Sequence, residues 1–109
     1  MGMAAATFRL LYLNAFRFEL ENKIQVITES KLSLTRTINE LVSIGNDMDP
    51  ESEVVKQLQA RKEKLNELDK KLDMQMEMYK NQLQMVDAEV ESCRALIDKA
   101  IQRNFSYGK

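Results

Sequence analysis

Apolar residues recur every seven positions through most of this chain, and that spacing is what most restricts its fold. In the second half, the first series is Leu58, Leu65, Leu72, Tyr79, Val86, Cys93 and Ala100. A companion series lies four residues after members of the first, at Met76, Leu83, Val90 and Ile97. Two interleaved series place one apolar stripe along a helix and are typical of a coiled coil.

The first half repeats the pattern more loosely. One series is Leu13, Leu20, Ile27, Leu34 and Leu41, and the other contains Ile24 and Ile38, alternating with Arg17, Lys31 and Gly45. The segment 28–37 is rich in β-branched and hydroxyl residues, which disfavour helix, and its Leu-Ser-Leu-Thr alternation also fits a short strand. Because the heptad series passes through it unbroken, we predict a helix.

Between the halves lies the sequence SIGNDMDPESE, residues 43–53. Gly45 followed by Asn46 predicts a left-handed helix C-cap, and Asp49 followed by Pro50 predicts an N-cap with proline at the first helical position. A connection this short joins antiparallel neighbours. The predicted fold is therefore all-α: an antiparallel two-helix coiled-coil hairpin, with helices over about 3–44 and 50–104, a turn over about 45–49, and completion by oligomerisation.

We predict a single domain, 1–109, with an apolar N-terminal segment, 3–20, and a short aromatic tail, 104–109. Where Lys62 and Asp69 interrupt the companion series, Val54 and Leu68 are expected to fill the seam. The predicted hairpin core is Leu20, Ile24, Ile27, Leu34, Ile38, Leu41, Leu58, Leu65, Leu72, Met76, Tyr79, Leu83, Val86, Val90, Cys93 and Ile97.

The opening helix has apolar side chains around most of its circumference. Phe8, Tyr12 and Phe16 form one stripe, whereas Leu11 and Phe18 lie on another side. One hairpin partner covers a single stripe, so a further surface must cover the rest. Two more aromatic residues lie near the C-terminus. The predicted assembly interface is Phe8, Leu11, Tyr12, Phe16, Phe18, Phe105 and Tyr107.

Charge and composition exclude several partners. Sixteen basic and seventeen acidic residues leave a net charge of −1, and over 61–73 the two kinds are interleaved, so the chain lacks the basic stripe of a nucleic-acid binder. No stretch is long and apolar enough for a transmembrane segment, and the N-terminal helix has no basic polar face for a membrane surface. No cleavable signal peptide is predicted, which leaves the cytoplasm or export by a signal-independent route.

Chemical machinery is not expected. The chain has no histidine and no Gly-rich phosphate loop, so we predict no enzyme, no cofactor and no metal. The acidic turn around Asp47 and Asp49 lacks the glycine of a calcium loop, and capping explains its carboxylates better. The single cysteine, Cys93, is interpreted as a small core residue. Met74, Met78 and Met85 lie off the seam, as a second interface or as ordinary exposed side chains.

In plan, a helical hairpin with a proline-bearing turn, core heptads and apolar terminal helices resembles the needle and filament subunits of type III secretion systems. The resemblance covers the architecture of the whole chain and no specific motif. The turn Asn46–Pro50 has one proline where needle subunits tend to have a denser proline signal, and this chain is longer. The resemblance implies a subunit that assembles with copies of itself.

Two functions are therefore open. The first is a structural protein that self-assembles through helical packing into a homo-oligomeric bundle or filament. The alternative is a coiled-coil adaptor or export chaperone that binds a different protein, such as another helical protein, through its apolar N-terminal helix. A self-assembling protein is expected to grow in mass with concentration when pure, whereas an adaptor stays small until its partner is added.

Overall fold

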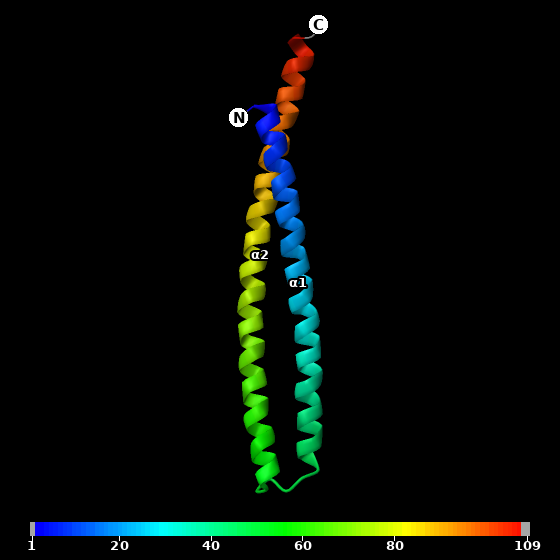
Figure 1. Cartoon of the computed structure of the whole chain (residues 1–109), viewed down its shortest axis with the longest axis vertical. Coiled ribbons are helices and arrows are strands. Elements are labelled where there is room, and N and C mark those ends of the chain that lie inside the picture. The colour runs from blue at the N-terminus through cyan, green and yellow to red at the C-terminus, as the bar shows by residue number, and fades with distance from the viewer. Residues whose placement is uncertain (1, 108–109) are drawn as a thin grey trace. The chain divides into compact units, whose positions relative to one another are not determined.

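The computed structural model describes residues 2–107, with side chains described as far as Phe105. It contains two helices, α1 (Met3–Asn46) and α2 (Glu53–Tyr107), and the described residues form no strand. The two helices run antiparallel against one another (Figure 1). This confirms the predicted two-helix hairpin, whereas its completion by oligomerisation stays a prediction.

The hairpin divides into two compact units. Unit 1 contains the chain up to Lys23 together with the chain from Tyr79 onward, and unit 2 contains Ile24–Met78. Each unit therefore consists of one piece of α1 and one piece of α2. The two units are described separately below.

The threonine-rich part of α1 is helical throughout, so the alternative of a short strand over 28–37 is wrong. Two of its hydroxyl groups are satisfied within the helix itself. Thr28 Oγ1 donates a hydrogen bond to the carbonyl oxygen of Ile24 at 2.9 Å, and Thr37 Oγ1 donates to that of Ser33 at 3.0 Å. These bonds to the preceding turn let Thr occupy helix positions that face solvent.

The turn differs in detail from the prediction. Gly45 stays inside α1 and does not have a positive φ, so the left-handed cap is wrong. Asp49 and Pro50 precede α2 and form a turn in which the Ser52 amide donates to the Asp49 carbonyl oxygen at 3.0 Å. The N-cap is Ser52, whose Oγ accepts from the Val55 amide at 3.3 Å. Proline favours the second position of such a turn, which explains why it does not begin the helix.

Unit 1 contains the best packed part of the seam. Leu13, Leu20 and Val90 are at most 2% exposed, and Val86 and Cys93 are 5% exposed. Leu10, Phe16, Tyr79 and Leu83 pack against this cluster while remaining partly exposed. Every seam position here is apolar on α2, so the two helices bury a continuous hydrophobic stripe.

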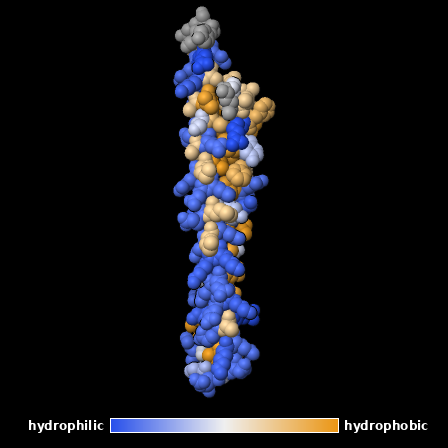
Figure 2. All heavy atoms as spheres, turned by 90° about the vertical axis from the view of Figure 1, so that its left-hand side faces the viewer, coloured by the Kyte–Doolittle hydropathy of each residue, from blue (hydrophilic) through white to orange (hydrophobic). Residues whose placement is uncertain are grey.

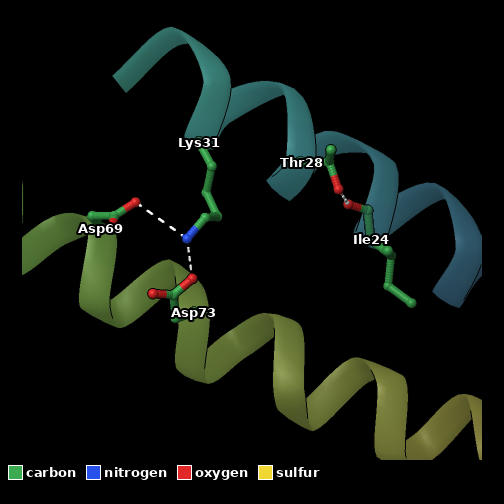
Figure 3. Close-up of polar contacts among 5 residues, drawn as sticks. All are labelled: Ile24, Thr28, Lys31, Asp69 and Asp73. Atoms are coloured by element: carbon green, nitrogen blue, oxygen red, sulfur yellow. Dashed lines mark hydrogen bonds and ion pairs between the residues drawn. The ribbon is translucent and has the colours of Figure 1, made fainter. Parts of the chain in front are cut away.

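Unit 2 has a more polar seam. Lys31 of α1 extends between Asp69 and Asp73 of α2 and forms an ion pair with both, at 3.3 Å from Asp69 Oδ1 (Figure 3). The hydrogen bond to Asp73 is the main reason why the pKa of Lys31 is raised. Because Lys31 and Asp69 both occupy seam positions, this contact favours one register of the helices over its neighbours.

Grooves accompany this polar seam within unit 2. A groove of about 400 Å³ opens where Leu34 and Ser33 face Leu65 and Leu72. A second, of about 330 Å³, lies beside the turn and is lined by Leu41, Leu58 and Pro50 among others. The helices of unit 2 therefore bury less than those of unit 1, where the seam is closed by Leu, Val and Cys side chains.

The structure places the predicted core residues as follows. Buried are Leu20, Ile27, Leu34, Val86, Val90 and Cys93, and half-buried are Ile24, Ile38, Leu41, Leu58, Leu65, Leu72, Met76, Tyr79, Leu83 and Ile97. Val54 and Leu68 were expected to fill the seam where Lys62 and Asp69 interrupt it. That prediction is wrong, since Val54 is 49% and Leu68 is 46% exposed. Val55 is buried instead, at 8% exposure, because it lies seven residues before Lys62 in the companion series. Ala6 and Leu13 are also buried and extend the α1 series to the N-terminus.

Candidate assembly surface

The side of α1 that faces away from the seam is strongly apolar in unit 1. Phe8 is 73%, Leu11 is 62%, Tyr12 is 59% and Phe18 is 63% exposed. At ~100° per residue, Phe8, Leu11 and Phe18 fall within an arc of about 80°, and Tyr12 lies ~40° beyond Phe8. Leu13 and Leu20, which point into the seam, lie on the opposite side of the helix. We call the set Phe8, Leu11, Tyr12 and Phe18 the outer α1 face.

This face has the spacing of a second coiled-coil seam. Along this side of α1, positions 4, 8, 11, 15 and 18 are separated by four and three residues in turn. They are occupied by Ala, Phe, Leu, Ala and Phe, and so include three of the four residues of the outer α1 face. No charged residue occupies these positions, and the next two in the series are Asn22 and Gln25. Alternating four- and three-residue steps keep side chains on one side of a helix, where they are suited to packing against another helix.

Figure 2 shows where apolar surface gathers on one side of the molecule. On the face shown, hydrophobic residues are concentrated over unit 1, whereas hydrophilic residues predominate over unit 2. The exposed apolar residues of unit 2, such as Val26 and Leu32, are separated by charged or polar neighbours. Scattered exposed residues of that kind are normal on soluble proteins, but a contiguous patch marks a binding surface.

Phe16 differs from the other predicted interface residues. It is half-buried and packs against the core cluster of unit 1, so it belongs to the hairpin seam rather than to the outer face. Its ring stacks on that of Tyr12, with centroids 6.3 Å apart and planes 4° apart. The Phe16 ring therefore packs against both the Tyr12 ring and the core cluster, and it contributes to the stability of the single chain.

Arginine side chains hold the edge of the outer α1 face in place. The Arg9 guanidinium lies 5.3 Å from the centroid of the Tyr12 ring and forms a 2.7 Å ion pair with Glu89 of α2. The hydrogen bond to Glu89 raises the pKa of Arg9. Arg17 pairs with Asp87 at 3.5 Å. These contacts fix the rotation of α1, which keeps Phe8, Leu11 and Phe18 pointing away from α2.

The C-terminal end of α2 belongs to the same unit. Phe105 is 70% and Ile101 is 52% exposed. The helix continues to Tyr107, beyond the predicted end near residue 104, and the side chain of Tyr107 lies outside the described residues. In unit 1, this end of α2 extends past the start of α1 (Figure 1). Four of the predicted aromatic interface residues are therefore exposed on unit 1: Phe8, Tyr12 and Phe18 on α1, and Phe105 on α2.

The methionines of α2 separate as the heptad pattern predicts. Met76 is half-buried at the seam, whereas Met74, Met78 and Met85 are 73%, 46% and 67% exposed. Met85 belongs to unit 1, and the other two belong to unit 2. The exposure of Met74, Met78 and Met85 fits both alternatives, a second interface and ordinary exposed side chains.

The described part of the chain has few features that suit chemistry. Within residues 2–107, there is no cluster of three or more His, Cys, Asp or Glu side chains suited to a metal ion. The thiol of Cys93 is buried in the seam. Neither helix, as far as it is described, has a stretch long and apolar enough to cross a bilayer.

Comparison with protein families finds no match to this chain, and neither do comparisons with curated proteins and with solved structures. The outer α1 face and its surroundings are therefore the basis for any functional argument.

Proposed function

We propose that this chain is a structural protein whose copies assemble through the outer α1 face. The observation that carries the proposal is the position of Phe8, Leu11, Tyr12 and Phe18. All four are large, all are at least 59% exposed, and all lie on the side of α1 that its hairpin partner does not reach.

The area of this face supports an interface. At roughly 150–250 Å² per aromatic side chain, the four exposed residues present about 500 Å² of apolar surface. That is near the upper end of the largest patch on a typical monomer, about 300–600 Å². It is also more than half of the ~800 Å² that each partner contributes to a standard protein interface.

The chemistry of the face favours a protein partner. Aromatic side chains lose little conformational entropy on binding and are enriched at the energetic centres of interfaces. No lysine or arginine occupies the outward positions from Ala4 to Phe18, and Arg9 and Arg17 at the edge of the face are already paired with Glu89 and Asp87, which leaves no basic border to meet anionic lipid headgroups. Burial against another helical chain is the arrangement that leaves the fewest groups unsatisfied.

Replacing two aromatic residues tests the proposal. The Phe8→Ser, Phe18→Ser double variant is expected to remain as helical as the original chain but to lose association. Both side chains are exposed in the hairpin, so their loss removes little from the intramolecular seam. Circular dichroism measures the helix content, and multi-angle light scattering measures the mass.

A matched control comes from unit 2. The Val54→Ser, Leu68→Ser double variant removes two side chains of α2 that are 49% and 46% exposed, lie in unit 2 and are not part of the outer α1 face. It is expected to associate like the original chain. Equal association of the two double variants would refute the proposal. A chain that is monomeric at every concentration would instead favour the adaptor, whose outer α1 face waits for a different protein.

A further inference from the structure

A second surface in unit 1 lies on α2, on the side facing away from the seam. Its positions alternate in steps of four and three residues and have no charged group: Asn81, Met85, Ala88, Ser92 and Ala95. All five are exposed. At ~100° per residue they fall within an arc of about 80°, opposite the seam residues Val86 and Val90. We call this set the outer α2 stripe.

Most side chains of the outer α2 stripe are small. Ser92 Oγ donates a hydrogen bond to the carbonyl oxygen of Ala88 at 3.1 Å, so its hydroxyl is satisfied within the helix. Ser92 therefore needs no polar partner from another chain, and Asn81 at the end of the stripe is the one other polar side chain in the set. A helix that presents Ala and Ser at these positions permits close approach of another helix.

The outer α1 face and the outer α2 stripe lie at the same level of unit 1. The ion pairs show this, because Arg9 meets Glu89 and Arg17 meets Asp87 across the seam. Segment 4–18 of α1 therefore runs alongside segment 81–95 of α2. The two surfaces have equal length and point away from each other on opposite sides of the same unit.

We propose that the outer α1 face of one copy packs against the outer α2 stripe of the next copy. This inference rests on the proposed function and names the partner surface that it needs. With the copies side by side in the same direction, Phe8 lies against Ser92 and Ala95, and Leu11 lies against Ala88. Phe18 meets Met85, whose thioether is a favourable neighbour for an aromatic ring.

Shape favours this pairing over contact between two α1 faces. Bulky aromatic side chains on one helix need holes on the other, and Ala88, Ser92 and Ala95 leave such holes. Two outer α1 faces placed together would set Phe8 and Phe18 against equally bulky residues and leave the outer α2 stripe uncovered. Only the mixed pairing covers both uncharged surfaces of unit 1.

Charge favours the same choice. Segment 4–18 of α1 contains Arg9 and Arg17 and no acidic residue, a net charge of +2. Segment 81–95 of α2 contains Asp87, Glu89, Glu91 and Arg94, three acidic residues and one basic, a net charge of −2. Pairing α1 with α2 brings opposite net charges together, whereas pairing like with like does not. The arginines already pair within the hairpin, so charge here selects the partner more than it strengthens binding.

The pairing has a consequence for the assembly. Because the two surfaces differ, the contact is head-to-tail, and each copy keeps one outer α1 face or one outer α2 stripe free for a further copy. Such contacts produce a closed ring if the rotation between copies closes, and an open filament if it does not. A simple two-fold dimer is not expected.

Cysteine cross-linking between chains tests the pairing directly. In a Cys93→Ala background, one preparation has Leu11→Cys and another has Ala88→Cys. Both positions are exposed, and the background change removes the only other thiol. On oxidation, a mixture of the two is expected to give a disulfide-linked dimer containing one chain of each. Neither preparation alone is expected to cross-link.

The outcomes separate this inference from the proposed function. Efficient cross-linking of the Leu11→Cys preparation with itself would show an α1-to-α1 contact and overturn the inference, as would oligomers of the mixture that do not cross-link. In both cases light scattering still shows assembly, so the proposed function survives. A mixture that remains monomeric at every concentration would overturn both.

A charge substitution on the outer α2 stripe provides an independent check. Ala88→Lys places a charged side chain in the centre of the stripe and is expected to reduce association at least tenfold. The control is Ala60→Lys, which changes the same residue type at the same heptad position, is also exposed, but lies in unit 2. Equal association of the two variants would contradict the pairing.

Discussion

Replacing Leu20 by alanine is expected to destabilise the hairpin by about 3 kcal/mol, whereas the same change at Leu11 is expected to cost less than about 1 kcal/mol in dilute solution. The two residues lie on the same helix within unit 1, but Leu20 is 1% and Leu11 is 62% exposed. The pair therefore separates burial within the chain from any effect of residue type or helix propensity.

The magnitude follows from the atoms removed. Leucine to alanine deletes three carbon atoms, worth about 2.4 kcal/mol at ~0.8 kcal/mol each when fully buried. A cavity term adds to this at Leu20, where Leu13 and Val86 line the same cluster. The thin core of a two-helix hairpin lets neighbours relax into the space, which keeps the total near the lower half of the usual range of about 2–5 kcal/mol.

Urea unfolding followed by circular dichroism measures both variants. At roughly 4 °C per kcal/mol for a chain of about 100 residues, Leu20→Ala is also expected to lower the melting temperature by about 12 °C. Leu11→Ala behaves differently with concentration, because assembly stabilises the folded state by mass action. Its melting temperature is expected to match the original chain when dilute and to fall below it when concentrated. Equal destabilisation by the two variants in dilute solution would refute the assignment of Leu20 to the seam and Leu11 to the surface.

Three further predictions concern the seam and the turn. Gly45→Ala is expected to stabilise the protein by about 0.5–1 kcal/mol, because Gly45 is helical and an added Cβ meets only Leu58 Cδ1 at 4.0 Å; a loss of stability in urea unfolding would instead show that this residue needs a left-handed conformation. The raised pKa of Lys31 means that its charge stabilises the folded state below the usual lysine pKa of about 10.4 and ceases to do so as the pH rises through the folded value. The stability difference between the original chain and Lys31→Met is therefore expected to stay constant from pH ~7 to pH ~10 and to shrink as the pH rises above about 10.4, and a difference that does not shrink there would contradict the ion pair with Asp69 and Asp73. Amide hydrogen exchange is expected to be slower in α2 from Val86 to Cys93 than from Leu65 to Leu72, since the first segment lies in the closed core and the second lines a groove; equal protection would show that the two units open together.

The heptad pattern predicted the fold because burial in a two-helix hairpin depends almost entirely on position in the repeat. Leu20, Val86, Val90 and Cys93 are buried as their spacing requires. The prediction that Val54 fills the seam is wrong because Val54 occupies a position of neither heptad series. Val55 lies seven residues before Lys62 and could have been identified by extending the companion series backwards.

The turn could not be predicted in detail, because several residues offered competing caps. Asp49 before Pro50 and Ser52 before Glu53 are both good N-cap sequences, and only the geometry of the connection decides between them. Asp49 Oδ1 instead accepts from the Glu51 amide at 3.1 Å, which stabilises the turn and moves the helix start to Glu53.

The composition of the opening helix indicated an unburied apolar surface, but not which residues form it. Phe16 was grouped with Phe8 and Tyr12 by their spacing of four residues. That spacing drifts around the helix by ~40° at each step. Phe8 consequently faces away from α2, whereas Phe16 reaches the seam and packs against the core. Knowing the direction of the partner helix was necessary to separate them.

The molar mass of the unmodified chain as a function of concentration tests the central claim most directly. Sedimentation equilibrium gives this mass without a label or a substitution. If the outer α1 face assembles copies of the chain, the mass is expected to equal the 12.7 kDa monomer in dilute solution and to rise through successive multiples as the concentration increases. A mass that stays at 12.7 kDa into the millimolar range, with the helices intact by circular dichroism, would contradict self-assembly.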